Sequence, residues 1–128
     1  MQKVKDIMTT EVATIQGTAT VAEAVSMMKQ RQQRDLVVEP RSKEDAYGIV
    51  TEADIVYKVA AYGKDPDEVQ VHEIMTKPCI VVNPDLSVEH VARLFANHHI
   101  RRAPVIKGEL LGVVSVTDIM RQVMWWLE

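Results

Sequence analysis

Two short segments pair a hydroxyl side chain with a carboxylate three residues later. Thr51 precedes Asp54, and Ser115 precedes Asp118. Each pair follows an apolar run that contains a glycine, and each pair is expected to open a helix. One interpretation is helix capping, in which the hydroxyl caps the helix and the acid complements its dipole. The other is ligand binding, because helix N–H groups favour an anion such as phosphate and a carboxylate can accept hydrogen bonds from ribose hydroxyls. The two interpretations are compatible.

The two pairs occupy equivalent positions of an internal repeat. Residues 4–9 (VKDIMT) recur as residues 71–76 (VHEIMT), an offset of 67, whereas an offset of 64 relates Asp54 to Asp118. The difference of three residues falls in the polar stretch 40–45, which is expected to be an exposed loop. We therefore expect a first repeat over residues 1–62, a linker over 63–70 and a second repeat over 71–128.

Each repeat is expected to fold as strand, helix, strand, strand and helix. The expected strands are 12–15, 35–38 and 47–50 in the first repeat, and 79–82, 103–106 and 111–114 in the second. Thr20 and Ser87 stand where helix N-caps belong. A single layer of strands cannot cover its own apolar face. The sequence therefore predicts an α/β protein whose two β-α-β-β-α repeats pack sheet to sheet about a pseudo-two-fold axis.

Composition excludes several classes of protein. The 128 residues, 47% of them hydrophobic, suit one compact domain. A formal charge of −3 argues against non-specific nucleic-acid binding. A single cysteine excludes an intramolecular disulfide. The sequence contains neither an apolar stretch of membrane-spanning length nor a signal-peptide core, so we expect a cytoplasmic protein that does not engage a membrane.

Both repeats carry hydrophobic-Met-Thr at the start and Gly-hydrophobic-hydrophobic-Ser/Thr-x-x-Asp near the end. Together with the strand start at residues 100–106 (IRRAPVI), this doubled set resembles a tandem pair of cystathionine-β-synthase (CBS) domains, a Bateman module. The resemblance covers nearly the whole chain. It implies a standalone regulatory module for signal transduction that binds adenosine nucleotides in clefts between the repeats. AMP and ATP are the foremost expected ligands, with ADP and S-adenosylmethionine as others. A homodimer and a separate effector protein are the implied partners.

The resemblance also implies two nucleotide-binding sites, in which Asp118 would hold the ribose and the arginines would meet phosphate. Site A would comprise Thr9, Ala13, Thr14, Arg101, Arg102, Ser115, Thr117 and Asp118. Site B would comprise Thr76, Ile80, Val81, Arg34, Thr51 and Asp54. Site B departs from the pattern, because Asp35 stands in place of Arg102 and Ala53 in place of Thr117. A carboxylate repels phosphate, so site A is expected to bind nucleotide better. Site B would be weak, empty or suited to a less charged ligand, such as adenosine or S-adenosylmethionine.

Other functions are less favoured. No nucleophile set, Gly-rich phosphate loop or helical metal-ligand pair is evident, so we expect no catalysis, no bound metal and no covalent cofactor. Residues 98–102 (HHIRR) could face an anion or form a solvated helix end, and they leave nucleic-acid binding open. Cys79 is expected to be a small core residue. Trp125 and Trp126 favour a subunit interface over packing on the chain's own core. A purely structural dimerisation module remains a further alternative.

Overall fold

The computed structural model describes the backbone of residues 2–127 and the side chains of residues 2–122. The tryptophan side chains predicted to form an interface, Trp125 and Trp126, lie outside the described residues. The chain divides into two compact units, Met1–Val12 with Ile80–Glu128 (unit 1) and Ala13–Cys79 (unit 2). These units differ from the two sequence repeats. Each unit contains the body of one repeat and the opening segment of the other.

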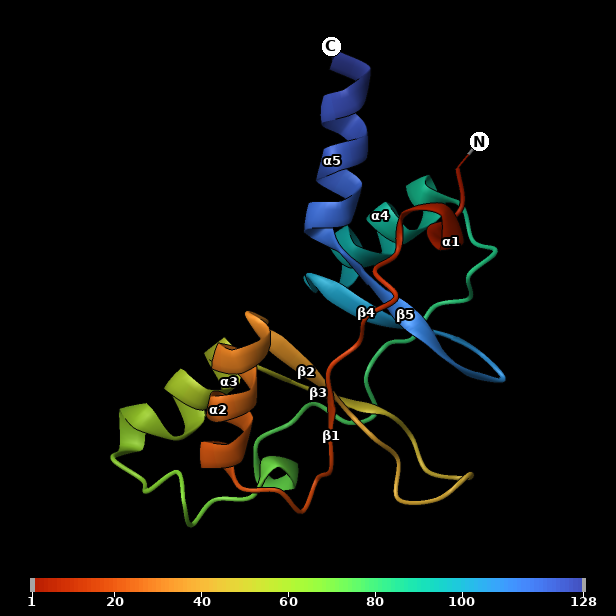
Figure 1. Ribbon diagram of the computed structural model, residues 1–128. Helices are drawn as coiled ribbons and strands as arrows, with labels where there is room; N and C mark the ends of the chain where they lie inside the picture. Colours follow the sequence, from red (N-terminus) through yellow and green to blue (C-terminus); the bar gives the residue numbers. More distant parts are fainter. Residues whose placement is uncertain (1, 128) are drawn as a thin grey trace. The chain divides into compact units, whose positions relative to one another are not determined.

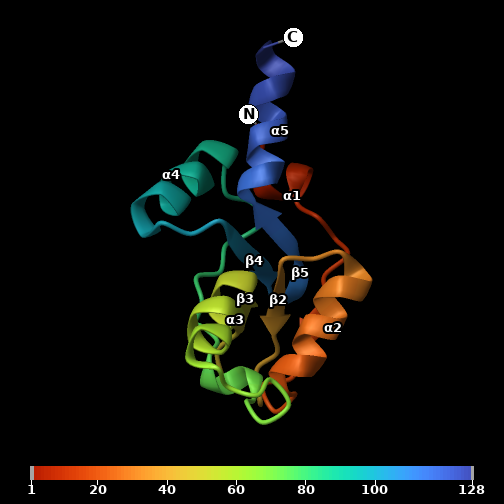
Figure 2. The same cartoon turned by 90° about the vertical axis from the view of Figure 1, so that its left-hand side faces the viewer.

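Unit 2 has the expected order of strand, helix, strand, strand and helix. Its elements are β1 (Thr14–Ile15), α2 (Val21–Arg31), β2 (Asp35–Val38), β3 (Gly48–Thr51), α3 (Glu52–Lys58) and the 3-10 turns η1 (Ala60–Tyr62) and η2 (Val71–Glu73). β2 is the central strand, parallel to β1 and antiparallel to β3. Both α-helices lie on the same side of this sheet (Figures 1 and 2). The sheet therefore has one helix-covered face, and β3 leads directly into α3.

The start of α2 illustrates how the sequence positions these elements. Thr20 caps the helix, because its Oγ accepts a hydrogen bond from the Glu23 N–H at 3.1 Å. Behind the cap, Val21 and Met28 are buried in the same hydrophobic cluster as Leu36 of β2. The helical spacing of the apolar residues thus attaches α2 to the sheet.

Unit 1 has the same order of elements as unit 2, except that its first strand is a single bridge. Its elements are α1 (Val4–Ile7), α4 (Val88–His98), β4 (Arg102–Lys107), β5 (Glu109–Ser115) and α5 (Val116–Leu127). The strand expected over residues 79–82 is wrong in extent, since only Val82 forms a parallel bridge, to Val105 of β4. Towards residue 80, a parallel ladder would need the N–H of Pro104 to donate to the Ile80 carbonyl, and proline has no N–H to donate. The antiparallel pair β4–β5 leads into α5 as β2–β3 leads into α3.

The opening segment of the chain is built into unit 1. Val4 is fully buried, and its N–H donates to the Leu86 carbonyl at 2.9 Å. Thr9 and Val113 of β5 exchange both backbone hydrogen bonds at 2.9 Å. Figure 1 shows this red segment beside the blue strand and helix of the same unit. In unit 2, Thr76 pairs with β3 in the same way. The two opening segments are therefore exchanged between repeats.

An ion-pair cluster around Asp85 joins the opening segment to the rest of unit 1, and its strength depends on pH. Asp85 accepts from Lys107 Nζ at 3.0 Å and pairs with Lys5 Nζ at 3.2 Å. The Lys107 hydrogen bond, followed by that of Lys5, lowers the pKa of Asp85 below its ordinary value of 3.8. Because the folded-state pKa is the lower one, the stabilisation is complete above that ordinary value. It is lost as the pH falls through the folded-state pKa.

We therefore expect Asp85→Asn to lower the melting temperature at about pH 7, and the difference from wild type to shrink towards about pH 2. This difference in melting temperature decreases because the wild-type Asp85 carboxylate also loses its charge in acid. Thermal unfolding followed by circular dichroism over this range measures the difference. A difference that stays constant down to the lowest pH would show that the charge of Asp85 does not stabilise the fold.

Candidate functional site

Ser115 and Asp118 form a complete capping box at the start of α5. The Ser115 N–H and Oγ donate to Asp118 Oδ2 at 2.8 and 2.9 Å, and the Asp118 N–H donates to Ser115 Oγ at 3.2 Å. Both residues are buried, with exposed fractions of 4% and 8%. The capping interpretation of the sequence is thus confirmed, and it places a fixed carboxylate at this end of β5.

The second oxygen of this carboxylate is held more loosely. Asp118 Oδ1 faces Arg121 Nη1 at 4.0 Å, an ion pair too long for a hydrogen bond. The Arg121 side chain is 76% exposed, so the pair contributes little to stability. A ligand hydroxyl could therefore replace this contact at Oδ1 at small cost while Oδ2 continues to cap the helix.

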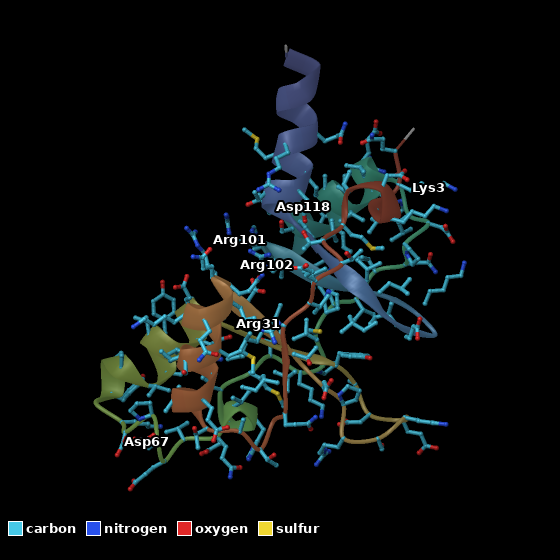
Figure 3. The ribbon with its side chains drawn as sticks, viewed as in Figure 1. Lys3, Arg31, Asp67, Arg101, Arg102 and Asp118 are labelled. Atoms are coloured by element: carbon cyan, nitrogen blue, oxygen red, sulfur yellow. The ribbon has the colours of Figure 1, made fainter. Side chains whose placement is uncertain are left out.

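Two arginines lie at the same end of the β4–β5 strand pair as Ser115. Arg102 is in register with Ser115, and the Arg101 carbonyl accepts from the N–H of Val116 at 2.8 Å. Figure 3 shows both arginines and Asp118 at this end of β4 and β5. Arg101 is exposed and Arg102 half-buried. Their charge and the positive end of the α5 helix dipole would favour an anion beside the carboxylate.

Thr9 and Thr117 add two exposed hydroxyl groups to unit 1. Thr117 lies in the first turn of α5, and Thr9 pairs with β5 two residues before its end. The pairing requires Gly112, because a Cβ there would stand 2.6 Å from the Thr9 carbonyl oxygen. The expectation that this glycine permits a close approach is confirmed. Unit 1 thus contains the following predicted site A residues: Thr9, Arg101, Arg102, Ser115, Thr117 and Asp118.

Unit 2 builds the same arrangement around Asp54. The Thr51 N–H and Oγ donate to Asp54 Oδ2 at 2.9 and 3.1 Å, and the Asp54 N–H donates to Thr51 Oγ at 3.1 Å. The Arg34 carbonyl accepts from the first N–H of α3 at 3.0 Å. Arg34 itself is exposed, as is Thr76, which pairs with β3. In register with Thr51 stands buried Asp35, where unit 1 has an arginine.

Sequence reasoning missed one residue of this second arrangement, Lys58. Its Nζ lies 3.1 Å from Asp54 Oδ1 and donates to the Ile74 carbonyl at 2.8 Å. The spacing of four residues between Asp54 and Lys58 is the signal that could have revealed the pair. The equivalent position of the second repeat holds Gln122, which is neutral. The two capping carboxylates therefore have different surroundings.

The remaining predicted site residues lie in the other unit from their expected partners. Ala13 is buried in the core of unit 2, where its carbonyl accepts from the Val37 N–H at 3.1 Å, and half-buried Thr14 begins β1. Half-buried Ile80 and exposed Val81 belong to unit 1. Their contribution to the two sites stays a prediction.

Two other features of the described residues bear on the chemistry of the protein, the Cys79 thiol and the side chains that could bind a metal ion. Burial raises the pKa of the half-buried Cys79 thiol to about 11, so the reactive thiolate is scarce at neutral pH. Across residues 2–122, no three His, Cys, Asp or Glu side chains gather where they could hold a metal ion. Within the same described part, no helix is long and apolar enough to cross a membrane.

Comparison with known proteins identifies relatives of the whole arrangement. The CBS domain family model matches residues 4–61 and 71–124. The CBS domain-containing protein YhcV of Bacillus subtilis is 36% identical over 120 residues, which cover 93% of this chain and 84% of YhcV. The solved structure of a hexameric CBS-CP12 protein from bloom-forming cyanobacteria is 61% identical, with a TM-score of 0.90 over 94% of this chain and 70% of that chain.

A further solved structure is that of a CBS domain pair with ligands. The CBS pair of protein MJ0100, in complex with 5′-methylthioadenosine and S-adenosyl-L-methionine, is 26% identical to this chain. Its TM-score is 0.85, and the match covers 98% of both chains. Two family matches over most of the chain, the repeated capping box and the α/β units lead to one conclusion. The chain belongs to the CBS domain family and contains two CBS domains in tandem.

Proposed function

We propose that this protein is a regulatory module that binds an adenosine-containing ligand through the Asp118 end of unit 1. The observation that carries the proposal is the state of the Asp118 carboxylate. It is buried and fixed through Oδ2 by Ser115, while Oδ1 has a long ion pair to a mostly exposed arginine. A buried carboxylate oxygen in this state is a suitable acceptor for ribose hydroxyl groups.

The neighbouring residues suit the other parts of such a ligand. Arg101 and Arg102, at the positive end of the α5 helix dipole, would bind the phosphates of AMP or ATP. Thr9 and Thr117 would supply hydroxyl groups, and Ala13 and Thr14 would border the base or phosphate, as the family resemblance implies. The adenosine ligands of the MJ0100 CBS pair support this ligand class.

Regulation would follow from unequal affinity for two arrangements of the protein. A ligand can shift an equilibrium only by its difference in affinity between the two states. We propose that the bound ligand changes the packing of the repeats or subunits and that a separate effector protein responds, without turnover of the ligand. The hexameric CBS-CP12 relative supports self-assembly, of which the expected cytoplasmic homodimer is the simplest form.

A thermal-shift screen tests the proposal. The purified protein is heated with AMP, ADP, ATP, GTP, NADH, 5′-methylthioadenosine or S-adenosylmethionine. A ligand at about 100 times its dissociation constant adds about 2.7 kcal/mol of stability, which is several degrees for a protein of this size. We expect adenosine ligands to raise the melting temperature more than GTP does, with no release of phosphate from ATP. No shift with any adenosine ligand would contradict the proposal and favour a purely structural module.

Nucleic-acid binding is the alternative that exposed Arg101 and its neighbour Arg102 support. It predicts binding of RNA or DNA that weakens steeply with added salt, because bound cations are released from the phosphate backbone. The net charge of −3 opposes it. Titration of a fluorescent oligonucleotide at low and high salt would distinguish the two functions.

A further inference from the structure

The two capping boxes have the same internal geometry but different neighbours at one repeat-equivalent position. Lys58 lies four residues after Asp54, and Gln122 lies four residues after Asp118. Residues four apart on a helix are neighbours on its surface, so each can reach the carboxylate that precedes it. A lysine is present in unit 2, where its Nζ contacts Asp54 Oδ1 at 3.1 Å.

Both carboxylate oxygens of Asp54 already have partners. Oδ2 accepts from the Thr51 N–H and Oγ at 2.9 and 3.1 Å, and Oδ1 is paired with Lys58. A ribose can bind this carboxylate only by competing with the ammonium group for Oδ1. At Asp118, the corresponding oxygen lies 4.0 Å from Arg121 Nη1, and that distance leaves room for a hydroxyl donor.

A second contact holds the lysine in this position. Lys58 Nζ also donates to the Ile74 carbonyl at 2.8 Å, so one ammonium group joins α3 to the opening segment carried by unit 2. Displacing Lys58 would break both this bond and a charge-assisted contact with Asp54. Arg121 is 76% exposed on its side chain, against 48% for Lys58, and would be displaced more easily.

We propose that Lys58 acts as a specificity-determining residue that keeps ribose from Asp54, so that each chain takes one adenosine ligand, at Asp118. This inference rests on the proposed function. It adds how many adenosine ligands each chain binds and which residue determines that number. Two changes already noted in unit 2, Asp35 and Ala53, act on phosphate and hydroxyl contacts. Lys58 acts on the ribose contact itself.

A reciprocal exchange tests this role directly. Lys58→Gln gives unit 2 the residue found in unit 1, and Gln122→Lys gives unit 1 the residue found in unit 2. Isothermal titration calorimetry with AMP and, separately, with 5′-methylthioadenosine measures the number of ligands per chain. Lys64→Gln is the matched control, because this lysine of the same unit lies 5.9 Å from the centre of the Tyr62 ring and its loss changes the net charge equally.

We expect one ligand per chain for wild type and for Lys64→Gln. We expect a second, weaker ligand for Lys58→Gln, and affinity at least about tenfold lower for Gln122→Lys, since a strong charge-assisted contact must then be broken. Lys58→Met serves as a second variant that removes the charge without adding an amide, and it should behave like Lys58→Gln. Circular dichroism establishes that each variant is folded before titration.

The outcomes separate this inference from the proposed function. Two ligands bound to wild type, or one ligand bound to both Lys58 variants, would overturn the role of Lys58 and leave adenosine binding intact. Unchanged affinity in folded Gln122→Lys would also overturn it. No binding of either probe to any of the proteins would overturn both, because there would be no ribose for Lys58 to exclude.

Discussion

Asp118→Ala is expected to reduce strongly the stabilisation that adenosine ligands give, whereas Asp54→Ala is expected to leave it nearly unchanged. Replacing Asp118 removes Oδ1, the carboxylate oxygen whose 4.0 Å contact with Arg121 is too long for a hydrogen bond. A hydrogen bond to a charged group contributes about 1.5–3 kcal/mol, which corresponds to a loss of about 10- to 150-fold in affinity. Asp54 has the same position in its own unit but is already paired with Lys58.

The two variants form a matched pair because both lose a capping box. Each substitution removes a carboxylate that binds the N–H and hydroxyl of the capping residue, at a cost of about 1 kcal/mol to the fold. A difference in ligand response between them therefore reports binding rather than general instability. Melting temperatures with and without AMP, together with calorimetric dissociation constants, measure that difference. Equal loss of binding in both variants, or greater loss in Asp54→Ala, would contradict the assignment of the site to unit 1.

Gly112→Ala is expected to destabilise the protein strongly. The added Cβ would lie 2.6 Å from the Thr9 carbonyl oxygen and would also approach the Met8 side chain. Thr9 exchanges two backbone hydrogen bonds with β5, so neither backbone can retreat without breaking that pairing. Overpacking of this kind costs about 1–3 kcal/mol, and we expect the upper end because the obstructing atom belongs to the main chain.

Urea unfolding of three glycine variants measures this effect. Gly48→Ala should cost less than Gly112→Ala, because its nearest neighbours are a flexible methionine sulfur at 3.0 Å and a carbonyl oxygen at 3.2 Å. Gly17→Ala is the control, since the nearest atom to its Cβ would be at an ordinary contact distance of 3.4 Å. If Gly112→Ala unfolded at the same urea concentration as Gly17→Ala, the opening segment would not be packed against β5 as described.

Local structure could largely be predicted from local sequence. The strand over residues 35–38 was predicted with the bounds of β2, and Thr20 and Ser87 cap α2 and α4 as expected. Gly63 ends η1 with a positive φ of 63°, as its place in the linker suggests. These features depend on side chains within a few residues, so a pattern in one segment is sufficient to reveal them.

Features that depend on distant segments could not be predicted in this way. The repeat shows that two opening segments are equivalent, but it does not show which sheet each one joins. The strand expected over residues 79–82 is only a bridge at Val82, because Pro104 of β4 has no N–H to donate to the Ile80 carbonyl. The contact of Lys58 with the Ile74 carbonyl likewise requires the segment carried from the other repeat. The short helix α1 was not predicted either.

A nuclear magnetic resonance titration of 15N-labelled protein with AMP would show which of the two capping carboxylates lies at the ligand site. Backbone amide signals report binding residue by residue without any substitution. We expect the largest shifts to fall on residues 101–102 and 115–118, at the start of α5, and residues 51–54 at the start of α3 to change less. Largest shifts at residues 51–54, or no shifts at an AMP concentration that saturates other nucleotide-binding proteins, would contradict the assignment of the ligand site to the Asp118 end of unit 1.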